Sequence, residues 1–128
     1  MPGTPLIAIV DDDESIRETT KDLLESAGLS AAAFTSAESF LKSRRFERFS
    51  CLIADMRMAG MSGLALHQKL VASNRSIPTI LVSAHPEERA RAQAAQSKVV
   101  CFLTKPFVPE QLLACVRSAI ERRNGGAE

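Results

Sequence analysis

Four short apolar runs, each followed by a polar residue suited to phosphate chemistry, constrain the fold of this chain more than any other feature. The runs cover residues 6–10, 51–54, 77–82 and 99–103, and the residues that follow them are Asp11, Asp12, Asp13, Asp55, Ser83, Thr104 and Lys105. Apolar runs without alternation are typical of strands buried on both faces of a parallel sheet. Ligands bind such sheets outside the carboxyl ends of the strands. We therefore expect these polar side chains to gather at one edge.

Helical periodicity alternates with the apolar runs. Asp13 and Ser36 are placed as helix N-caps, Gly28 as a helix stop, and Pro109 as a first helical residue. The expected helices cover 14–27, a short segment after the weak alanine-rich strand 30–34, 63–72, 86–98 and 109–122. This order predicts five strands alternating with five helices in a doubly wound α/β sandwich. The 86–98 helix has almost only alanines to bury, so we expect it to be the least stable element.

The composition excludes several classes of protein. The 128 residues are 45% hydrophobic and 24% charged, with a net charge of +1, as is ordinary for one globular domain. Such neutrality provides no electrostatic footprint for nucleic acid or a membrane. The apolar stretches are too short to span a bilayer, and the first residues do not resemble a signal peptide.

The three cysteines, Cys51, Cys101 and Cys115, are odd in number, widely spaced and set among apolar residues. We predict buried, free thiols in a reducing cytosol rather than metal ligands or disulfide partners.

The polar cluster favours phosphoryl chemistry on a carboxylate. Mg²⁺ prefers oxygen ligands, and Asp12, Asp55 and a backbone carbonyl of the following loop supply them, with Asp11 acting through water. One carboxylate then attacks a phosphoryl group. Lys105 and Ser83 donate to phosphoryl oxygens. Each residue also has an ordinary interpretation, as a helix cap, a turn or a strand end.

The chain from Ile7 to about Ile120 resembles the receiver domain of two-component response regulators. The residues that carry the resemblance are Val10-Asp11-Asp12-Asp13, Asp55-Met56-Arg57-Met58-Ala59-Gly60-Met61-Ser62-Gly63, Ser83-Ala84 and Lys105-Pro106-Phe107. The resemblance implies a flavodoxin-like fold with five parallel strands in the order 2-1-3-4-5. It also implies a receiver domain over residues 1–123, with 124–128 as a disordered tail or truncated linker.

The resemblance assigns roles to individual residues. Asp55 would be the phosphoryl acceptor, and Asp11, Asp12, Asp55 and the Arg57 carbonyl would bind Mg²⁺ or Mn²⁺. Ser83 and Lys105 would sense the phosphate, and the Lys105–Pro106 bond would be cis. Phe102 occupies the position of the family's aromatic switch, with a plain core role as the alternative. Arg57 and His85 would tune the lifetime of the phosphate, although His85 can equally be a spacer before Pro86.

The function implied is a cytoplasmic signalling switch rather than an enzyme. A histidine kinase would donate the phosphoryl group, and the surface built from residues 86–122 would respond, controlling output that most resembles transcription. The resemblance allows homodimerisation on phosphorylation, DNA would be bound only through an effector domain absent from this chain, and no membrane is expected to be involved.

Two rival functions remain open at this stage. One is a receiver-like interaction module that works without phosphorylation. The other is a haloacid-dehalogenase-type phosphatase with Asp11 as nucleophile and Asp13 as acid and base, but that class needs further acidic metal ligands after the lysine.

Some residues depart from the family pattern or have no assigned role. Ala59 stands where a proline is usual, Lys98-Val99 where Gly-Ala is usual, and Val108 where an N-cap residue is usual. We interpret His67 as a packing residue. The basic run of Arg44, Arg45 and Arg48 is interpreted as a solvated loop, with partner docking as the alternative.

Overall fold

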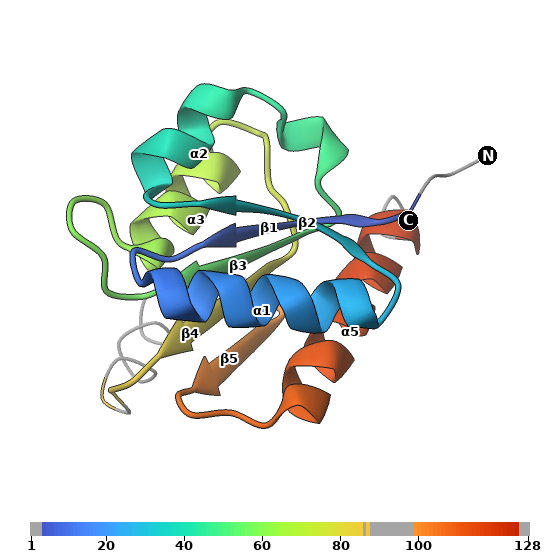
Figure 1. The fold of residues 1–128 in the computed structure, drawn as a ribbon. Helices are drawn as coiled ribbons and strands as arrows, with labels where there is room; N and C mark the ends of the chain where they lie inside the picture. Colours follow the sequence, from blue (N-terminus) through green and yellow to red (C-terminus); the bar gives the residue numbers. More distant parts are fainter. Residues whose placement is uncertain (1–3, 86, 88–98, 126–128) are drawn as a thin grey trace.

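Five parallel strands in the order β2-β1-β3-β4-β5 form the central layer of the computed structural model, which describes residues 4–85, 87 and 99–125 (Figure 1). This is the predicted order. The strands are β1 (Leu6–Val10), β2 (Ser30–Phe34), β3 (Cys51–Asp55), β4 (Thr79–Ser83) and β5 (Cys101–Thr104). All five point the same way, so the residues that follow them meet at one edge (Figure 1).

Helices cover both faces of the sheet, with α1 and α5 on one side and α2 and α3 on the other (Figure 1). Their bounds are α1 (Glu14–Ser26), α2 (Ala37–Ser43), α3 (Gly63–Ala72) and α5 (Pro109–Gly125), and a short 3₁₀ helix, η1, covers Phe46–Arg48. The last helix continues three residues beyond the predicted end at 122. The helix expected over 86–98 lies outside the described residues apart from Glu87.

The core consists of two apolar layers, one on each face of the sheet. Alternate residues of β1 serve the two layers: Ala8 and Val10 pack toward α2 and α3, whereas Ile7 and Ile9 pack toward α1 and α5. All four are buried because both faces of a parallel sheet are covered by helices. This double burial explains why the runs in the sequence are continuous rather than alternating.

The predicted helix signals are present in the structure. Asp13 accepts a hydrogen bond from the Ile16 N–H at 3.2 Å, and Ser36 accepts one from the Ser39 N–H at 3.0 Å. Gly28 has a φ of +87°, a conformation that glycine adopts at little cost after a helix. Such caps bind backbone donors that the first helical turn leaves unpaired.

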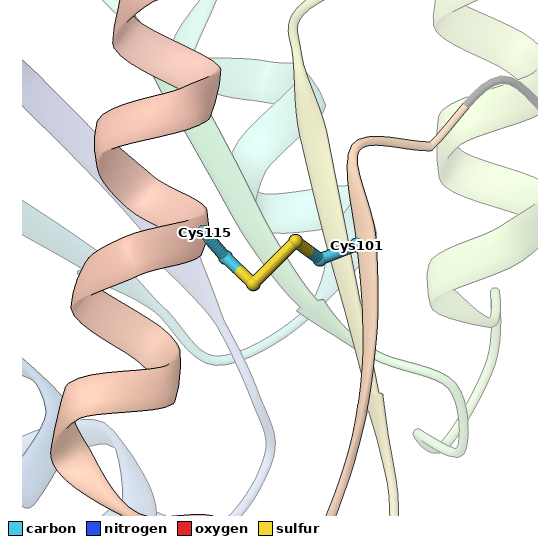
Figure 2. Close-up of a disulfide and its surroundings, with 2 residues drawn as sticks. All are labelled: Cys101 and Cys115. Carbon is cyan, nitrogen blue, oxygen red and sulfur yellow. A yellow bond between two sulfur atoms is a disulfide. The ribbon is translucent and has the colours of Figure 1, made fainter.

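The prediction of three free thiols is wrong, because Cys101 and Cys115 form a disulfide (Figure 2). Figure 2 shows the bond joining β5 to α5, whose Cα atoms at these positions lie 6.1 Å apart. The chain turns after β5 and α5 returns along the same strand, so residues fourteen positions apart face each other. Cys51 is free and buried as predicted, and burial raises the pKa of its thiol.

No helix within the described residues is both long and apolar enough to cross a membrane.

Candidate functional site

Three carboxylates meet at the carboxyl edge of the sheet. Asp11 and Asp12 follow β1, and Asp55 ends β3, the neighbouring strand. One oxygen from each carboxylate lies within 4.8 Å of the others. The central position of β1 and β3 brings them together, as the strand pattern predicted.

Backbone N–H groups hold two of these carboxylates in place. Asp11 Oδ1 accepts a hydrogen bond from the Asp13 N–H at 2.9 Å, and Asp55 Oδ1 accepts one from the Arg57 N–H at 3.2 Å. In each case the donor lies two residues further along the chain, so the turn that follows the strand fixes the orientation of the carboxylate. The second oxygen of each group, Oδ2, is then directed to the Lys105 ammonium.

Asp12 and Glu38 hold the loop that follows β3. Asp12 Oδ2 accepts a hydrogen bond from the Ala59 N–H at 3.2 Å, and Glu38 Oε2 accepts one from the Met61 N–H at 3.1 Å. Gly60 lies between these two anchors with a φ of +84°, and a Cβ there would lie 2.9 Å from Glu38 Oε2. Sequence reasoning missed Glu38, because an acidic residue in the first turn of a helix carries no sign of a distant loop partner.

Lys105 joins the carboxylates of Asp11 and Asp55. Its Nζ donates to Asp11 Oδ2 and to Asp55 Oδ2, each at 3.2 Å, and its side chain is only 18% exposed. The Lys105 N–H donates to the Ser83 carbonyl at 2.7 Å, and the Lys105–Pro106 bond is cis, as expected. One residue after β5 thus contacts the ends of β1, β3 and β4.

Burial and the neighbouring charges shift the pKa values of Asp55 and Lys105. Burial raises the pKa of Asp55 most and the Asp11 charge raises it further, while the Arg57 N–H and the Lys105 ammonium oppose the rise. Burial lowers the pKa of Lys105, but attraction to Asp11 and Asp55 outweighs burial, so this pKa is raised. The ammonium therefore remains charged between two carboxylates.

The donor set of the site fits a small divalent cation. Three carboxylates at one edge repel each other, and only one ammonium within the described site offsets them. Mg²⁺ takes oxygen ligands and is commonly held by one or two carboxylates plus water and phosphate oxygens. The side chains of Asp11, Asp12 and Asp55 match that preference. The contribution of the Arg57 carbonyl stays a prediction.

Ser83 lies at the end of β4, on the same edge as the acidic cluster. Its Oγ accepts a hydrogen bond from the His85 N–H at 2.9 Å and donates to the His85 carbonyl at 3.2 Å, and the residue is 1% exposed. Phe102, on β5, is partly buried and packs against the core layer on the α2 and α3 side. Its role as a switch stays a prediction.

Glu87 connects the two residues that we expect to tune the phosphate lifetime. Its Oε2 lies 3.8 Å from Arg57 Nη2 and 3.7 Å from His85 Nδ1. The side chains of Arg57 and Glu87 are more than half exposed, so the ion pair itself contributes little stability. Sequence reasoning missed Glu87, because it belongs to the polar segment after Pro86, where nothing marks one acidic residue above another.

Gly63 permits the close approach of α3 to β3. A Cβ at this position would collide with the Asp55 carbonyl oxygen and lie 2.9 Å from its carbon. These are backbone atoms, so no side-chain rotation relieves the contact. Helix α3 therefore begins directly against the residue that carries the central carboxylate of the site.

A largely apolar cavity of about 470 Å³ opens beside Lys105, between α1 and the loop from β5 to α5. Its walls include Ile16 and Leu23 of α1 and Pro106 and Phe107 of the loop. The cavity shares Lys105 with the acidic site, so a molecule seated in it would lie next to the carboxylates.

Comparisons with known proteins place this chain in a family. Residues 7–117 match the model of the response regulator receiver domain. The chain belongs to this family. Receiver domains are signalling domains of two-component systems, and the resemblance carried by the acidic cluster, Ser83 and Lys105 is confirmed at the level of the family. The phosphatase alternative is not favoured.

The relatives of this receiver domain include response regulators and transcriptional regulatory proteins. The chain is 38% identical over 116 residues to the response regulator protein TodT of Pseudomonas putida, covering 91% of this chain and 51% of TodT. It is 35% identical over 123 residues to the C4-dicarboxylate transport transcriptional regulatory protein DctD of Rhizobium meliloti, covering 96% of this chain and 27% of DctD. The chain thus spans between about a quarter and a half of these relatives.

Solved structures share the fold. The response regulator StyR superposes with a TM-score of 0.90 at 36% identity, over 98% of this chain and 63% of that one. A response regulator receiver protein from Pseudomonas putida superposes with a TM-score of 0.82 at 32% identity, over 92% of this chain and 99% of that one.

Proposed function

We propose that Asp55 accepts a phosphoryl group from a phosphohistidine of a sensor histidine kinase. The observation that carries this proposal is the Lys105 ammonium, which donates to both Asp55 and Asp11 at 3.2 Å. This arrangement orients a carboxylate and places a positive charge where the charge of a transferring phosphoryl group would lie.

Exposure favours Asp55 over its neighbours as the acceptor. The Asp55 side chain is 11% exposed, whereas that of Asp11 is 6% exposed and turned between Lys105 and the Asp13 N–H. Asp12 is exposed but holds the loop through Ala59. Asp55 alone combines a fixed orientation with partial access. In the transfer, an Asp55 oxygen bonds to phosphorus as the phosphorus–nitrogen bond to the donor histidine breaks, and the released imidazole takes up a proton.

Asp11, Asp12, Asp55 and the Arg57 carbonyl would hold Mg²⁺ or Mn²⁺ in this site. The cation would neutralise the repulsion between the carboxylates and the incoming phosphoryl oxygens. Lys105 and Ser83 would then each donate to a phosphoryl oxygen. Ser83 Oγ exchanges hydrogen bonds with the backbone of His85 in this structure, so it would turn from these partners to the phosphoryl oxygen.

The output follows from the charge that phosphorylation adds. A phosphoryl group adds close to two negative charges, which would draw Ser83 and Lys105 toward Asp55. Lys105 directly follows β5, so this pull would be transmitted to β5, to Phe102 and to α5, the proposed output surface. Arg57 and His85, joined by Glu87, would control the access of hydrolytic water.

The apolar cavity beside Lys105 would receive the helix of the donor kinase. Apolar grooves commonly bind one face of an amphipathic helix, and this groove borders the acceptor. By analogy with DctD, the output would be control of transcription in the cytoplasm, with DNA contacted through an effector domain and with homodimerisation on phosphorylation. The receiver unit would cover residues 1–123, although α5 itself continues to Gly125.

Intact-mass spectrometry tests the proposal. The protein is incubated with acetyl phosphate and Mg²⁺, beside the Asp55→Asn variant and a sample without divalent cations. We expect one phosphoryl adduct on the parent with Mg²⁺, and none on the variant or without the cation. An adduct that persists in Asp55→Asn would overturn the assignment. No adduct on the parent, together with no response to beryllofluoride, would favour an interaction module that works without phosphorylation.

A further inference from the structure

A basic cavity lies at the opposite end of the sheet from the acidic site. Its volume is about 730 Å³, and its charged lining consists of five arginines and one glutamate: Arg44, Arg45, Arg48, Arg75, Arg123 and Glu47. They come from the loop and 3₁₀ helix before β3, the loop before β4 and the last turn of α5. These segments lie at the starts of the strands, so the cavity is remote from Asp55 (Figure 1).

We propose that this cavity binds a small molecule carrying two or more adjacent phosphate groups. The chain as a whole has a net charge of only +1, with sixteen lysines and arginines, so five arginines in one cavity are a local concentration. Cavities of this volume fall in the range of small-molecule sites. Arginine binds phosphate through two parallel N–H donors, which makes it the usual residue for this recognition.

Two of the arginines are held in place by contacts between the cavity walls. Arg123 Nη1 donates to the Ser76 carbonyl at 3.1 Å, which ties the end of α5 to the loop before β4. The Arg75 guanidinium lies 5.3 Å from the centre of the Phe46 ring, which ties that loop to η1. Such fixed side chains lose less conformational entropy when a ligand binds.

The charge exceeds what the fold itself requires. Helices α2, α3 and α5 end near this cavity, and each helix terminus contributes at most about half a negative elementary charge. Those dipoles and Glu47, which also lines the cavity, together offset about half of the five positive charges. The surplus remains available to an anion.

The lining also favours phosphate over a nucleobase as the recognised group. Phe46 is 9% exposed and lies beneath Arg75, so within the described lining no open aromatic face is available for stacking. Recognition would therefore depend on the phosphate chain, whether inorganic or carried by a nucleotide. This inference is independent of phosphorylation at Asp55.

Isothermal titration calorimetry tests the proposal, with inorganic triphosphate as the probe and ATP and orthophosphate as comparisons. The buffer is freed of divalent cations with a chelating resin, so that the acidic site does not bind a metal–triphosphate complex. The parent is compared with Arg45→Gln/Arg48→Gln. The control is Lys69→Gln/Arg117→Gln, which removes the same charge from exposed positions outside the cavity.

We expect triphosphate to bind the parent and the control with equal affinity. It should bind the cavity variant at least about tenfold more weakly, because each lost arginine removes a hydrogen bond to a charged group. Orthophosphate should bind the parent at least about tenfold more weakly than triphosphate. In a separate assay with Mg²⁺, all proteins should still accept a phosphoryl group from acetyl phosphate, which separates this result from the fate of the proposed function. Arg48→Gln alone replaces the double variant if the latter does not fold.

Four results would overturn the proposal. Triphosphate could fail to bind the parent at millimolar concentration, or could bind the two double variants equally. Orthophosphate could bind as tightly as triphosphate. Finally, a short DNA duplex could bind the parent but not Arg45→Gln/Arg48→Gln while triphosphate binds neither protein, and this result would assign the cavity to nucleic acid.

Discussion

Lys105 Nζ lies 3.2 Å from Asp55 Oδ2 and 3.2 Å from Asp11 Oδ2, so one ammonium stands between the two carboxylates that a cation would share. Lys105 therefore both offsets the repulsion between the carboxylates and competes with a divalent cation for them. This dual role makes the electrostatics of the site measurable without any phosphoryl donor.

Lys105→Met should lower the free energy of unfolding in the absence of divalent cations by about 2–4 kcal/mol, because it leaves two facing carboxylates without their partner. Mg²⁺ should then raise the melting temperature of Lys105→Met more than that of the parent, since the ammonium no longer competes. Lys69→Met, at an exposed position of α3, provides the matched control. Thermal melts with and without Mg²⁺ measure both effects. An equal or smaller Mg²⁺ response in Lys105→Met would show that Lys105 and the cation do not share these oxygens.

The disulfide between Cys101 and Cys115 predicts a definite thiol count. The chain has three cysteines, so protein unfolded without reductant should show one reactive thiol, that of Cys51, and three after reduction. A thiol-reactive chromophore in denaturant measures the count. Three thiols before reduction would contradict the structure.

Reduction of this bond should also destabilise the domain. A closed loop of about this length is worth about 3 kcal/mol through the entropy of the unfolded chain. A reductant should therefore lower the melting temperature of the parent and leave Cys115→Ser unchanged. Equal effects on both proteins would mean that the reductant acts elsewhere.

Val108→Asp should stabilise α5 by about 1 kcal/mol. Val108 is 52% exposed and stands at the start of this helix, where the Gln111 side chain already accepts a hydrogen bond from the Val108 N–H at 3.2 Å. An aspartate would add the missing acceptor for the backbone N–H of the first turn and complete a reciprocal cap. Val108→Ala removes the same apolar surface without adding an acceptor. A melting temperature for Val108→Asp no higher than for Val108→Ala would count against this helix boundary.

His67 should make stability depend on pH. It is 3% exposed, and its Nδ1 lies 3.0 Å from Thr79 Oγ1, which itself donates to the Ile77 carbonyl. Nδ1 is therefore the protonated nitrogen, and burial lowers the pKa of the ring because a second proton would charge it. The unfolded chain binds that proton near pH 6.5 while the folded chain does not, so stability falls as pH falls through that value.

The loss should reach about 1 kcal/mol between pH 7.5 and pH 5.5. His67→Asn, which retains a donor toward Thr79, should lose correspondingly less. Chemical unfolding at several pH values measures the difference. The same pH slope in the parent and His67→Asn would show that His67 does not carry the effect.

Local signals in the sequence predicted the parts of the structure that depend on local chemistry. Asp13 and Ser36 cap their helices because a helix N-cap needs only a side-chain oxygen three residues before an unpaired backbone N–H. Asp11, Asp55 and Lys105 lie together because parallel strands end at one edge of the sheet.

The features that the sequence did not predict depend on packing between distant segments. The pairing of Cys101 with Cys115 depends on how α5 lies against β5, and Glu38 acts on a loop more than twenty residues away. The basic cavity is also formed by three separate segments of the chain. Only Arg44, Arg45 and Arg48 lie near one another in the sequence. Arg75 and Arg123 are isolated there, so the run alone favoured a solvated loop.

The most direct test of Asp55 as the phosphoryl acceptor is to locate the phosphoryl group on the chain. Protein phosphorylated with acetyl phosphate and Mg²⁺ is treated with borohydride, which reduces an aspartyl phosphate to homoserine, and its peptides are sequenced by mass spectrometry. We predict homoserine at position 55, with Asp11 and Asp12 unchanged. Homoserine at position 11 or 12, with Asp55 intact, would contradict the assignment of Asp55 as the acceptor.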